Sequence, residues 1–254
     1  MLPLFLATSS ITLFVFILAF FLAVVIRNNA IVDSLWGLGF IVVALISYFL
    51  SNGSFSGLIT LILVTLWGLR LFLHISLRNW GRGEDFRYAK WRADWGKTWV
   101  IRTFFQIFLL QWFLLQLVSL PIILAMTAPA PLWAIMFGTA IWLLGFIFEA
   151  VGDYQLTVFK KNPASKGKLM TTGLWSLTRH PNYFGEATLW WGIAVIAFAS
   201  TSNPLAFAGP LVIDFLLLYV SGIPLLEAKY QGRADWEKYA KKTPAFFPRL
   251  PSLL

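Results

Sequence analysis

The 254-residue sequence contains no cysteine and only two histidines, His74 and His180. The absence of cysteine excludes a disulfide framework, a thiolate nucleophile and metal sites built on cysteine. The two histidines lie far apart in the sequence, so we expect no metal centre. Charged residues are also scarce, at 12% of the chain, whereas hydrophobic residues make up 59% and the mean hydropathy is +0.75. This composition is typical of a membrane-embedded protein.

Seven apolar runs are long enough to cross a bilayer as helices. They cover residues 2–26, 30–50, 58–77, 103–126, 132–159, 183–200 and 204–227, and Pro121 predicts a kink in the fourth. The first run has no basic residue before it and is longer than the apolar core of a signal peptide, so we expect it to span. Between the third and fourth runs, YAKWRADWGK predicts a short interfacial helix. The prediction is one all-α, multi-pass membrane domain over residues 1–254.

Lysine and arginine are distributed unevenly among the loops. They follow the first, third, fifth and seventh runs, whereas the loops after the second, fourth and sixth runs contain none. By the positive-inside rule, seven helices then place the N-terminus outside and the C-terminus in the cytoplasm, which in a bacterium means the inner membrane. This placement accounts for the net charge of +9, so we expect no nucleic-acid partner, and no feature indicates an obligatory protein partner.

Ionisable residues interrupt the apolar runs, where they are costly. A basic stripe on the third run and an acidic stripe on the fifth have four-residue spacing, which places each on one helix face; they consist of Arg70, His74 and Arg78, and of Glu149 and Asp153. The stripes could pair as a structural network. Further carboxylates lie towards the same side, at Asp33, Glu186 and Glu227, and therefore favour a polar cavity open to the cytoplasm. Asp214 lies in the outer half of its run, where we expect a buried, hydrogen-bonded carboxyl.

The loops on the cytoplasmic side carry a collar of cations suited to a ligand with several phosphates: Arg82, Arg87, Lys160, Lys161, Lys166, Lys168 and Arg179. There is no GxGxxG after a strand and no Walker loop, so a nucleotide would have to bind among helices. The stretch TTGLWSLTRHPNYFGE, residues 171–186, places Arg179, Asn182 and Glu186 where the chain enters the sixth run. It predicts either a site at the membrane surface or an ordinary basic anchor with a helix beginning at Asn182.

Several segments resemble the bacterial DUF1295 branch of the steroid 5-alpha-reductase family. They are FEAVGDYQLTVFKKNP, GLWSLTRHPNYFGE, RGEDFRY and EKYAKKTPAFFP, and the resemblance extends over nearly the whole chain. RHPNYFGE alone is less specific. A similar RHPxYxG element occurs in isoprenylcysteine carboxyl methyltransferases and phospholipid methyltransferases, which bind S-adenosylmethionine.

The resemblance implies an enzyme that uses NADPH, bound in a helical cavity open to the cytoplasm, to reduce the carbon–carbon double bond of a 3-oxo-4-ene steroid or an isoprenoid-like lipid enone. Asp33 corresponds to the carbonyl-activating glutamate of the family. Trp67 falls at the position of its tyrosine partner, which is a departure, because an indole N–H does not release a proton at neutral pH. The resemblance and the collar together assign cofactor binding to Arg70, His74, Arg78, Asn79, Arg82, Glu149, Asp153, Tyr154, Lys160, Lys168, Arg179, Asn182, Glu186, Glu227, Tyr230 and Arg233.

Two other functions stay open at this point. A membrane methyltransferase of the isoprenylcysteine or phospholipid type would use the same collar and helix start to hold S-adenosylmethionine. A non-catalytic scaffold or lipid-binding protein would use the buried charges only as ion pairs. Two features count against the methyltransferase: the Glu149–Asp153 pair with its following tyrosine, and the number of cations, because S-adenosylmethionine has no phosphate to neutralise.

Overall fold

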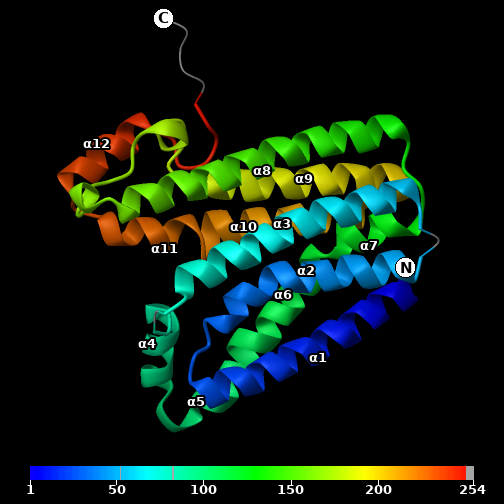
Figure 1. Cartoon of the computed structure of the whole chain (residues 1–254), viewed down its shortest axis with the longest axis horizontal. Helices are drawn as coiled ribbons and strands as arrows, with labels where there is room; N and C mark the ends of the chain where they lie inside the picture. The colour runs from blue at the N-terminus through cyan, green and yellow to red at the C-terminus, as the bar shows by residue number, and fades with distance from the viewer. Residues whose placement is uncertain (52, 82, 250–254) are drawn as a thin grey trace, which may run out of the picture. The chain divides into compact units, whose positions relative to one another are not determined.

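The computed structural model describes residues 1–51, 53–81 and 83–249, and Figure 1 shows the chain. All regular structure in these residues is helical, as the sequence predicts, and no strand occurs among them. Six stretches within the described chain are long and apolar enough to cross a membrane: Leu2–Ile26, Ile31–Phe49, Phe55–Asn79, Phe86–Thr127, Leu132–Lys161 and Pro204–Tyr230. The predicted all-α, multi-pass architecture is confirmed, and a seventh span stays a prediction.

The described residues form two compact units, each of which combines separate stretches of the chain. Unit 1 contains Met1–Ile135 and Ile196–Gly209, and unit 2 contains Met136–Val195 and the chain from Pro210 onward. The expectation of a single domain over the whole chain stays a prediction.

Unit 1 is built on the pairing of α2 (Ile31–Phe49) with α3 (Phe55–Asn79), and α1 (Leu2–Ile26) packs against α2. Glycine allows α2 and α3 to approach closely. A Cβ atom on Gly37 would lie 2.2 Å from the carbonyl oxygen of Gly68, and one on Gly68 would lie 2.6 Å from that of Gly37. The two backbones therefore touch without intervening side chains.

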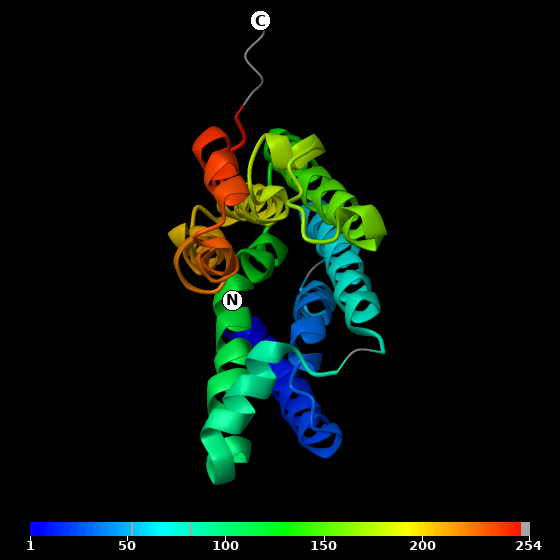
Figure 2. The same ribbon diagram turned by 90° about the vertical axis from the view of Figure 1, so that its left-hand side faces the viewer.

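The predicted fourth span is a broken helix in unit 1. It contains α5 (Trp99–Thr103), a π-helical turn (Phe104–Leu109), α6 (Leu110–Val118) and α7 (Leu120–Thr127). The break at Ser119, before Pro121 in the first turn of α7, confirms the predicted kink. The predicted interfacial helix is α4 (Phe86–Trp95), which crosses the direction of α1, α2 and α3 (Figures 1 and 2).

In unit 2, α8 (Leu132–Lys161) and α9 (Pro181–Thr201) lie side by side (Figure 1). A Cβ atom on Gly185 would lie 2.4 Å from the backbone nitrogen of Glu149, and one on Gly192 would lie 2.5 Å from the carbonyl oxygen of Gly138. Small residues at such contacts let helices pack closely in lipid. The close approach brings the first turns of α9 against the end of α8 that carries the predicted acidic stripe.

The predicted seventh span is also interrupted. It contains α10 (Ala208–Phe215), a π-helical turn (Leu216–Val220) and α11 (Ile223–Glu227), with Gly222 at the break. A Cβ atom on Gly222 would lie 2.3 Å from the carbonyl oxygen of Leu217, so the break requires glycine. The chain after this span forms the short helix α12 (Ala234–Lys242).

Candidate functional site

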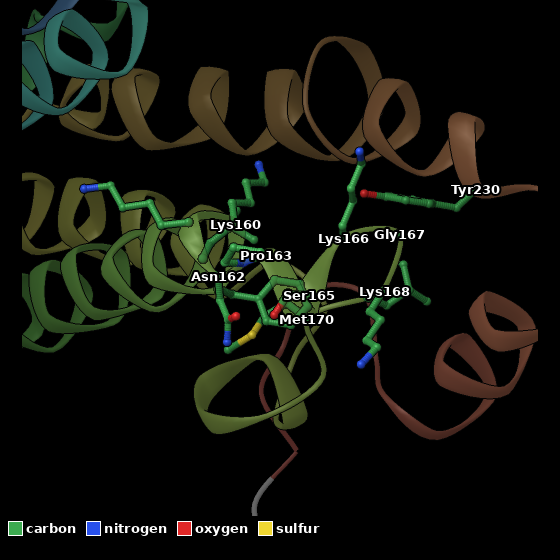
Figure 3. Close-up of a pocket in the computed structure, with 13 residues that line it drawn as sticks. Lys160, Asn162, Pro163, Ser165, Lys166, Gly167, Lys168, Met170 and Tyr230 are labelled. Carbon is green, nitrogen blue, oxygen red and sulfur yellow. The ribbon is translucent and has the colours of Figure 1, made fainter.

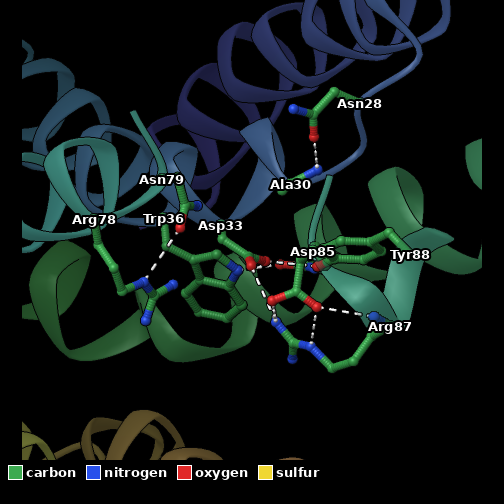
Figure 4. Close-up of polar contacts among 10 residues, drawn as sticks. Asn28, Ala30, Asp33, Trp36, Arg78, Asn79, Asp85, Arg87 and Tyr88 are labelled. Carbon is green, nitrogen blue, oxygen red and sulfur yellow. Dashed lines mark hydrogen bonds and ion pairs between the residues drawn. The ribbon is translucent and has the colours of Figure 1, made fainter. Parts of the chain in front are cut away.

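Asp33 lies in the first turn of α2, where a carboxylate is favoured by the helix dipole. Its Oδ1 atom accepts a hydrogen bond of 2.6 Å from the hydroxyl of Tyr88, and its Oδ2 atom accepts one of 3.2 Å from Nη2 of Arg87 (Figure 4). Both partners come from the first turn of α4. Asp33 is the acceptor in both hydrogen bonds.

The start of α4 is held by Asp85, whose carboxylate accepts from the backbone N–H of Arg87 at 3.0 Å and from Nε of Arg87 at 2.9 Å. Burial works to raise the pKa of Asp85, but the hydrogen bonds and charge of Arg87 outweigh it and hold that pKa below its usual value. Arg87 thus bridges two carboxylates, Asp33 and Asp85, and its guanidinium is fixed by both (Figure 4).

Tyr88 is itself oriented by a short chain of donors. Nε2 of Gln111 donates to the Tyr88 hydroxyl at 3.4 Å, and the indole N–H of Trp36 donates to Oε1 of Gln111. Tyr88 is 3% exposed. Its oxygen is therefore fixed between an amide and a carboxylate, and a phenol keeps its proton at neutral pH. In this structure the Tyr88 hydroxyl donates to Asp33 and accepts from Gln111.

Tyr88 and Gln111 were not predicted from the sequence. Tyr88 lies inside the RGEDFRY segment that carries the family resemblance, but nothing in that segment indicates Asp33 as its partner. The predicted partner, Trp67, is 1% exposed, and its ring centre lies 5.5 Å from that of Phe40. Phe40 lies at the same distance from Trp36. Trp67 is thus part of a buried aromatic row, and its catalytic role stays a prediction.

The predicted basic stripe of unit 1 lies on α3. Arg70, His74, Arg78 and Asn79 all belong to this helix, and Nε of Arg78 donates to Oδ1 of Asn79 at 3.2 Å. Arg82 lies outside the described residues.

A pocket of about 320 Å³ lies in unit 2, in the loop that follows α8 (Figure 3). It brings together three predicted cofactor residues, Lys160, Lys168 and Tyr230, with Lys161 and Lys166. Gly167, with φ of 78°, turns the loop between Lys166 and Lys168. In Figure 3 the Tyr230 ring points towards Lys166. Four lysines therefore line one pocket, and ammonium groups are donors that bind phosphate.

The acidic stripe of α8 is buried. Glu149 is 3% exposed and Asp153 is 9% exposed, and Nδ2 of Asn182 on α9 donates to Oδ1 of Asp153 at 3.1 Å. The Oδ1 atom of Asn182 is buried and has no hydrogen-bond partner among the described residues. Tyr154, next to Asp153, is 69% exposed. Glu149, Asp153 and Asn182 therefore lie where α8 meets the start of α9, and Glu186 follows one turn further along α9.

Arg179 binds protein groups in this structure. Its Nε and Nη2 atoms donate to the Glu227 carboxylate at 2.9 and 3.1 Å, and Nη1 donates to the carbonyl oxygens of Ala240 and Thr243. Nε2 of His180 lies 2.9 Å from Oε1 of Glu227. These contacts fasten α12 and the chain after it to the entrance of α9. The predicted cofactor roles of Arg179 and Glu227 stay predictions.

The structure also shows the hydrogen-bond partners of Arg233, a predicted cofactor residue, and of Asp214, an expected hydrogen-bonded carboxyl. Arg233 pairs with Asp235 at 2.7 Å and donates to the carbonyl oxygen of Gly167 at 2.9 Å. Arg233 therefore lies beside the lysine loop, which is the loop after α8 that carries Lys166 and Lys168. Asp214 is half-buried, and its Oδ2 accepts from the indole N–H of Trp191 at 3.0 Å, so the expected hydrogen-bonded carboxyl is confirmed. No group of three histidine, aspartate or glutamate side chains positioned to hold a metal ion occurs in the part of the chain that the structure describes.

A family model described as "Protein of unknown function (DUF1295)" matches residues 19–243. The chain belongs to the DUF1295 family. This family is part of the steroid 5-alpha-reductase-like group, as the sequence resemblance indicates.

The DUF1295 chain also resembles parts of several curated proteins. It is 24% identical over 121 residues to the Delta(14)-sterol reductase of Arabidopsis thaliana, which covers 44% of this chain and 32% of that protein. It is 49% identical over 53 residues to the "Probable O-methyltransferase ustE" of Ustilaginoidea virens, 21% of this chain and 18% of that protein. The "Cobalt-zinc-cadmium resistance protein CzcN" of Cupriavidus metallidurans is 30% identical over 113 residues, 42% of this chain and 48% of that protein.

The chain therefore spans less than half the length of each of these relatives. No solved structure gives a significant match.

Proposed function

We propose that this DUF1295 protein is an NADPH-dependent membrane reductase that saturates the carbon–carbon double bond of a 3-oxo-4-ene steroid or a similar lipid enone. The observation that carries this proposal is the hydrogen bond between Tyr88 and Asp33, held by Arg87 at the start of a membrane-spanning helix. Membership of the steroid 5-alpha-reductase-like group and the similarity to Delta(14)-sterol reductases support reduction as the reaction class.

The residues of unit 2 fit NADPH. Its three phosphates match the lysine pocket, where Lys160, Lys161, Lys166 and Lys168 would bind them. The buried, unpartnered Oδ1 of Asn182 fits a hydroxyl or amide donor, and ribose and nicotinamide each offer one. S-Adenosylmethionine has no phosphate for these lysines to bind. The chemistry of the donor set therefore favours NADPH.

NADPH, when bound, would supply the hydride for the β carbon of the enone. The protein groups act on the carbonyl: the Tyr88 hydroxyl donates a hydrogen bond to the oxygen on which enolate charge develops. The carbonyl oxygen then replaces Asp33 as the acceptor of the Tyr88 proton, while Gln111 still donates to the Tyr88 oxygen and Arg87 still donates to Asp33. Protonation of the α carbon completes the product, so each double bond consumes one NADPH and one proton and yields NADP⁺. Trp36 and Trp67 would form the wall along which a flat lipid lies.

For the topology we propose seven spans, with α9 as the sixth along the chain. Its 21 residues correspond to about 32 Å at about 1.5 Å per residue, which is enough to cross the hydrocarbon core. Its hydropathy is lowered by the polar residues of its first turns, which contribute to the proposed site. Seven spans keep the lysine loop and the C-terminus on the cytoplasmic side, where NADPH is available, and place the protein in the inner membrane of a bacterium.

Binding and turnover of the purified protein test this proposal. Isothermal titration should show binding of NADPH and none of S-adenosylmethionine, and NADPH should be oxidised when a 3-oxo-4-ene steroid is added. Asp33→Ala should bind NADPH normally and lose nearly all turnover. Binding of S-adenosylmethionine alone would point to a methyltransferase, the class that the partial similarity to the probable O-methyltransferase suggests. Binding of neither ligand would leave a scaffold as the remaining function.

A further inference from the structure

Glu84, the residue before the Asp85 cap of α4, forms an ion pair with Arg92 at the far end of the same helix. Its Oε1 atom also accepts a hydrogen bond of 2.8 Å from the backbone N–H of Asn29. Nη2 of Arg92 donates to the carbonyl oxygen of Arg27. The Glu84 and Arg92 side chains are 9% and 21% exposed. Both ends of this ion pair therefore bind the backbone of the turn between α1 and α2.

That turn sets the beginning of α2. Arg27 ends α1 with φ of 52°, and the side chain of Asn28 accepts from the backbone N–H of Ala30 at 3.0 Å (Figure 4). Asn29 is fully buried, and its Nδ2 donates to the hydroxyl of Thr103 at the end of α5. Asp33 follows in the first turn of α2. The ion pair between Glu84 and Arg92 thus holds α4 to the residues that immediately precede Asp33.

α4 buries few of its own side chains. It has ten residues, of which Tyr88 is the one that this structure buries, and Phe86 and Trp91 are 79% and 41% exposed. A helix shorter than about 12 residues is marginal without tertiary contacts. The contacts of Tyr88 and Arg87 with Asp33 form one anchor, but the proposed reaction perturbs that anchor when the Tyr88 hydroxyl turns to a substrate. The contacts of Glu84 and Arg92 form a second anchor that the reaction does not touch.

We propose that the Glu84–Arg92 ion pair is a positioning element for Tyr88 and Asp33, the acid pair: it clamps α4 onto the turn before α2 and thereby keeps Tyr88 beside Asp33, also when the hydroxyl turns to the substrate. Its catalytic consequence rests on the proposed reductase function. A displacement of about 1 Å at a reacting group costs about 10²-fold in rate. Loss of the clamp therefore slows proton donation while the lysine pocket, which lies in unit 2, keeps its affinity for NADPH.

The test uses Glu84→Gln, which removes the charge but keeps the acceptor for Asn29, and Arg92→Lys, which keeps the charge but loses the planar fork. Asp94→Asn, an exposed acid on the same helix, is the matched control. With NADPH and a 3-oxo-4-ene steroid, Glu84→Gln should lower kcat about 10- to 100-fold, with the Kd for NADPH unchanged, and Arg92→Lys should lie between Glu84→Gln and the wild type.

Isotope effects separate positioning from loss of folded enzyme. In Glu84→Gln the solvent deuterium effect on kcat should rise and the effect of deuterated NADPH should fall, because proton donation becomes the slow step. A lower kcat with unchanged isotope effects would mean that less enzyme is folded, and would overturn the proposal.

Amide hydrogen exchange tests whether the ion pair holds α4 in place, and this measurement does not require enzymatic activity. Amides of α4 and of residues 27–33 should exchange faster in Glu84→Gln than in the wild type, and Asp94→Asn should leave them unchanged. Equal exchange in Glu84→Gln and the wild type would overturn the clamp. If the wild type oxidises no NADPH, the proposed function fails, and the exchange result still decides whether the clamp exists.

Discussion

The hydroxyl oxygen of Tyr88 lies 2.6 Å from Oδ1 of Asp33, although 55 positions separate the two residues in the sequence. The contact joins the first turn of a spanning helix to a short helix outside the apolar runs. It gives unit 1 a phenol whose oxygen is fixed and whose proton is directed at a carboxylate. The predicted tyrosine position holds Trp67, and in the proposed reaction Tyr88 supplies the proton donor that an indole cannot.

Replacing Tyr88 with phenylalanine should remove the proton and keep the ring. We expect Tyr88→Phe to lower kcat about 10²- to 10⁴-fold, the usual contribution of a positioned acid, with little change in the Kd for NADPH. Steady-state turnover and isothermal titration measure the two effects. Tyr48→Phe, at the other end of α2, is the control and should retain wild-type rates. Undiminished kcat in Tyr88→Phe would remove the phenol from the mechanism.

The lysine pocket predicts a graded and salt-dependent affinity for NADPH. Lys166→Ala and Lys168→Ala should each raise the Kd for NADPH about 5- to 10-fold, which corresponds to about 1–1.4 kcal/mol for one exposed charge on a phosphate. The weakening of binding with added salt should also become less steep in each variant. Lys238→Ala on α12 alters a lysine that does not line the pocket and should leave the Kd unchanged. The same Kd in all three variants would place the cofactor elsewhere.

The contacts of Arg179 predict a structural role that can be separated from cofactor binding. Glu227→Gln leaves the guanidinium of Arg179 with a neutral partner, and should cost about 1–3 kcal/mol of stability. Limited proteolysis should then cut the chain after α12 faster than in the wild type, while the Kd for NADPH stays within about twofold of the wild-type value. If instead Arg179→Lys raised the Kd for NADPH without faster proteolysis, the guanidinium would be a phosphate ligand, as the sequence predicts.

Close packing of α8 on α9 predicts a sharp penalty at Gly185. The Cβ atom of Gly185→Ala would lie 2.4 Å from a backbone nitrogen of α8, and a backbone cannot move aside as a flexible side chain can. We expect a loss of about 1–3 kcal/mol, measured as a lower Tm in detergent. Gly83→Ala is the matched control, because a Cβ atom there would meet nothing within 4 Å. An equal Tm for the two variants would show that α8 and α9 lie further apart.

The spans were predictable because long apolar runs and loop charges are local signals. The two helix breaks differ in how well the sequence predicts them. Pro121 predicts a break by itself, whereas glycine is required at Gly222 only because the Leu217 backbone lies against it. The lysine pocket was predictable for a related reason, since four of its cations come from one short segment of chain.

The acid pair was only half predictable. Asp33 is conspicuous as a lone carboxylate in an apolar run, but its partners depend on where α4 lies, which no periodicity in the chain reports. The partners of Arg179 were not predictable either. The sequence shows a cation beside a helix start, but it does not show that this cation donates to the carbonyl oxygens of Ala240 and Thr243. Tertiary contacts of this kind are set by packing between distant segments.

Transfer of deuterium from NADPH carrying deuterium at C4 of the nicotinamide tests the central claim most directly. Wild-type protein with a 3-oxo-4-ene steroid should give a saturated ketone with one deuterium at the β carbon, detected by mass spectrometry, and Asp33→Ala should give almost none. Recovery of unchanged steroid from the wild type, with NADPH bound but not oxidised, would contradict the assignment of this protein as an enone reductase.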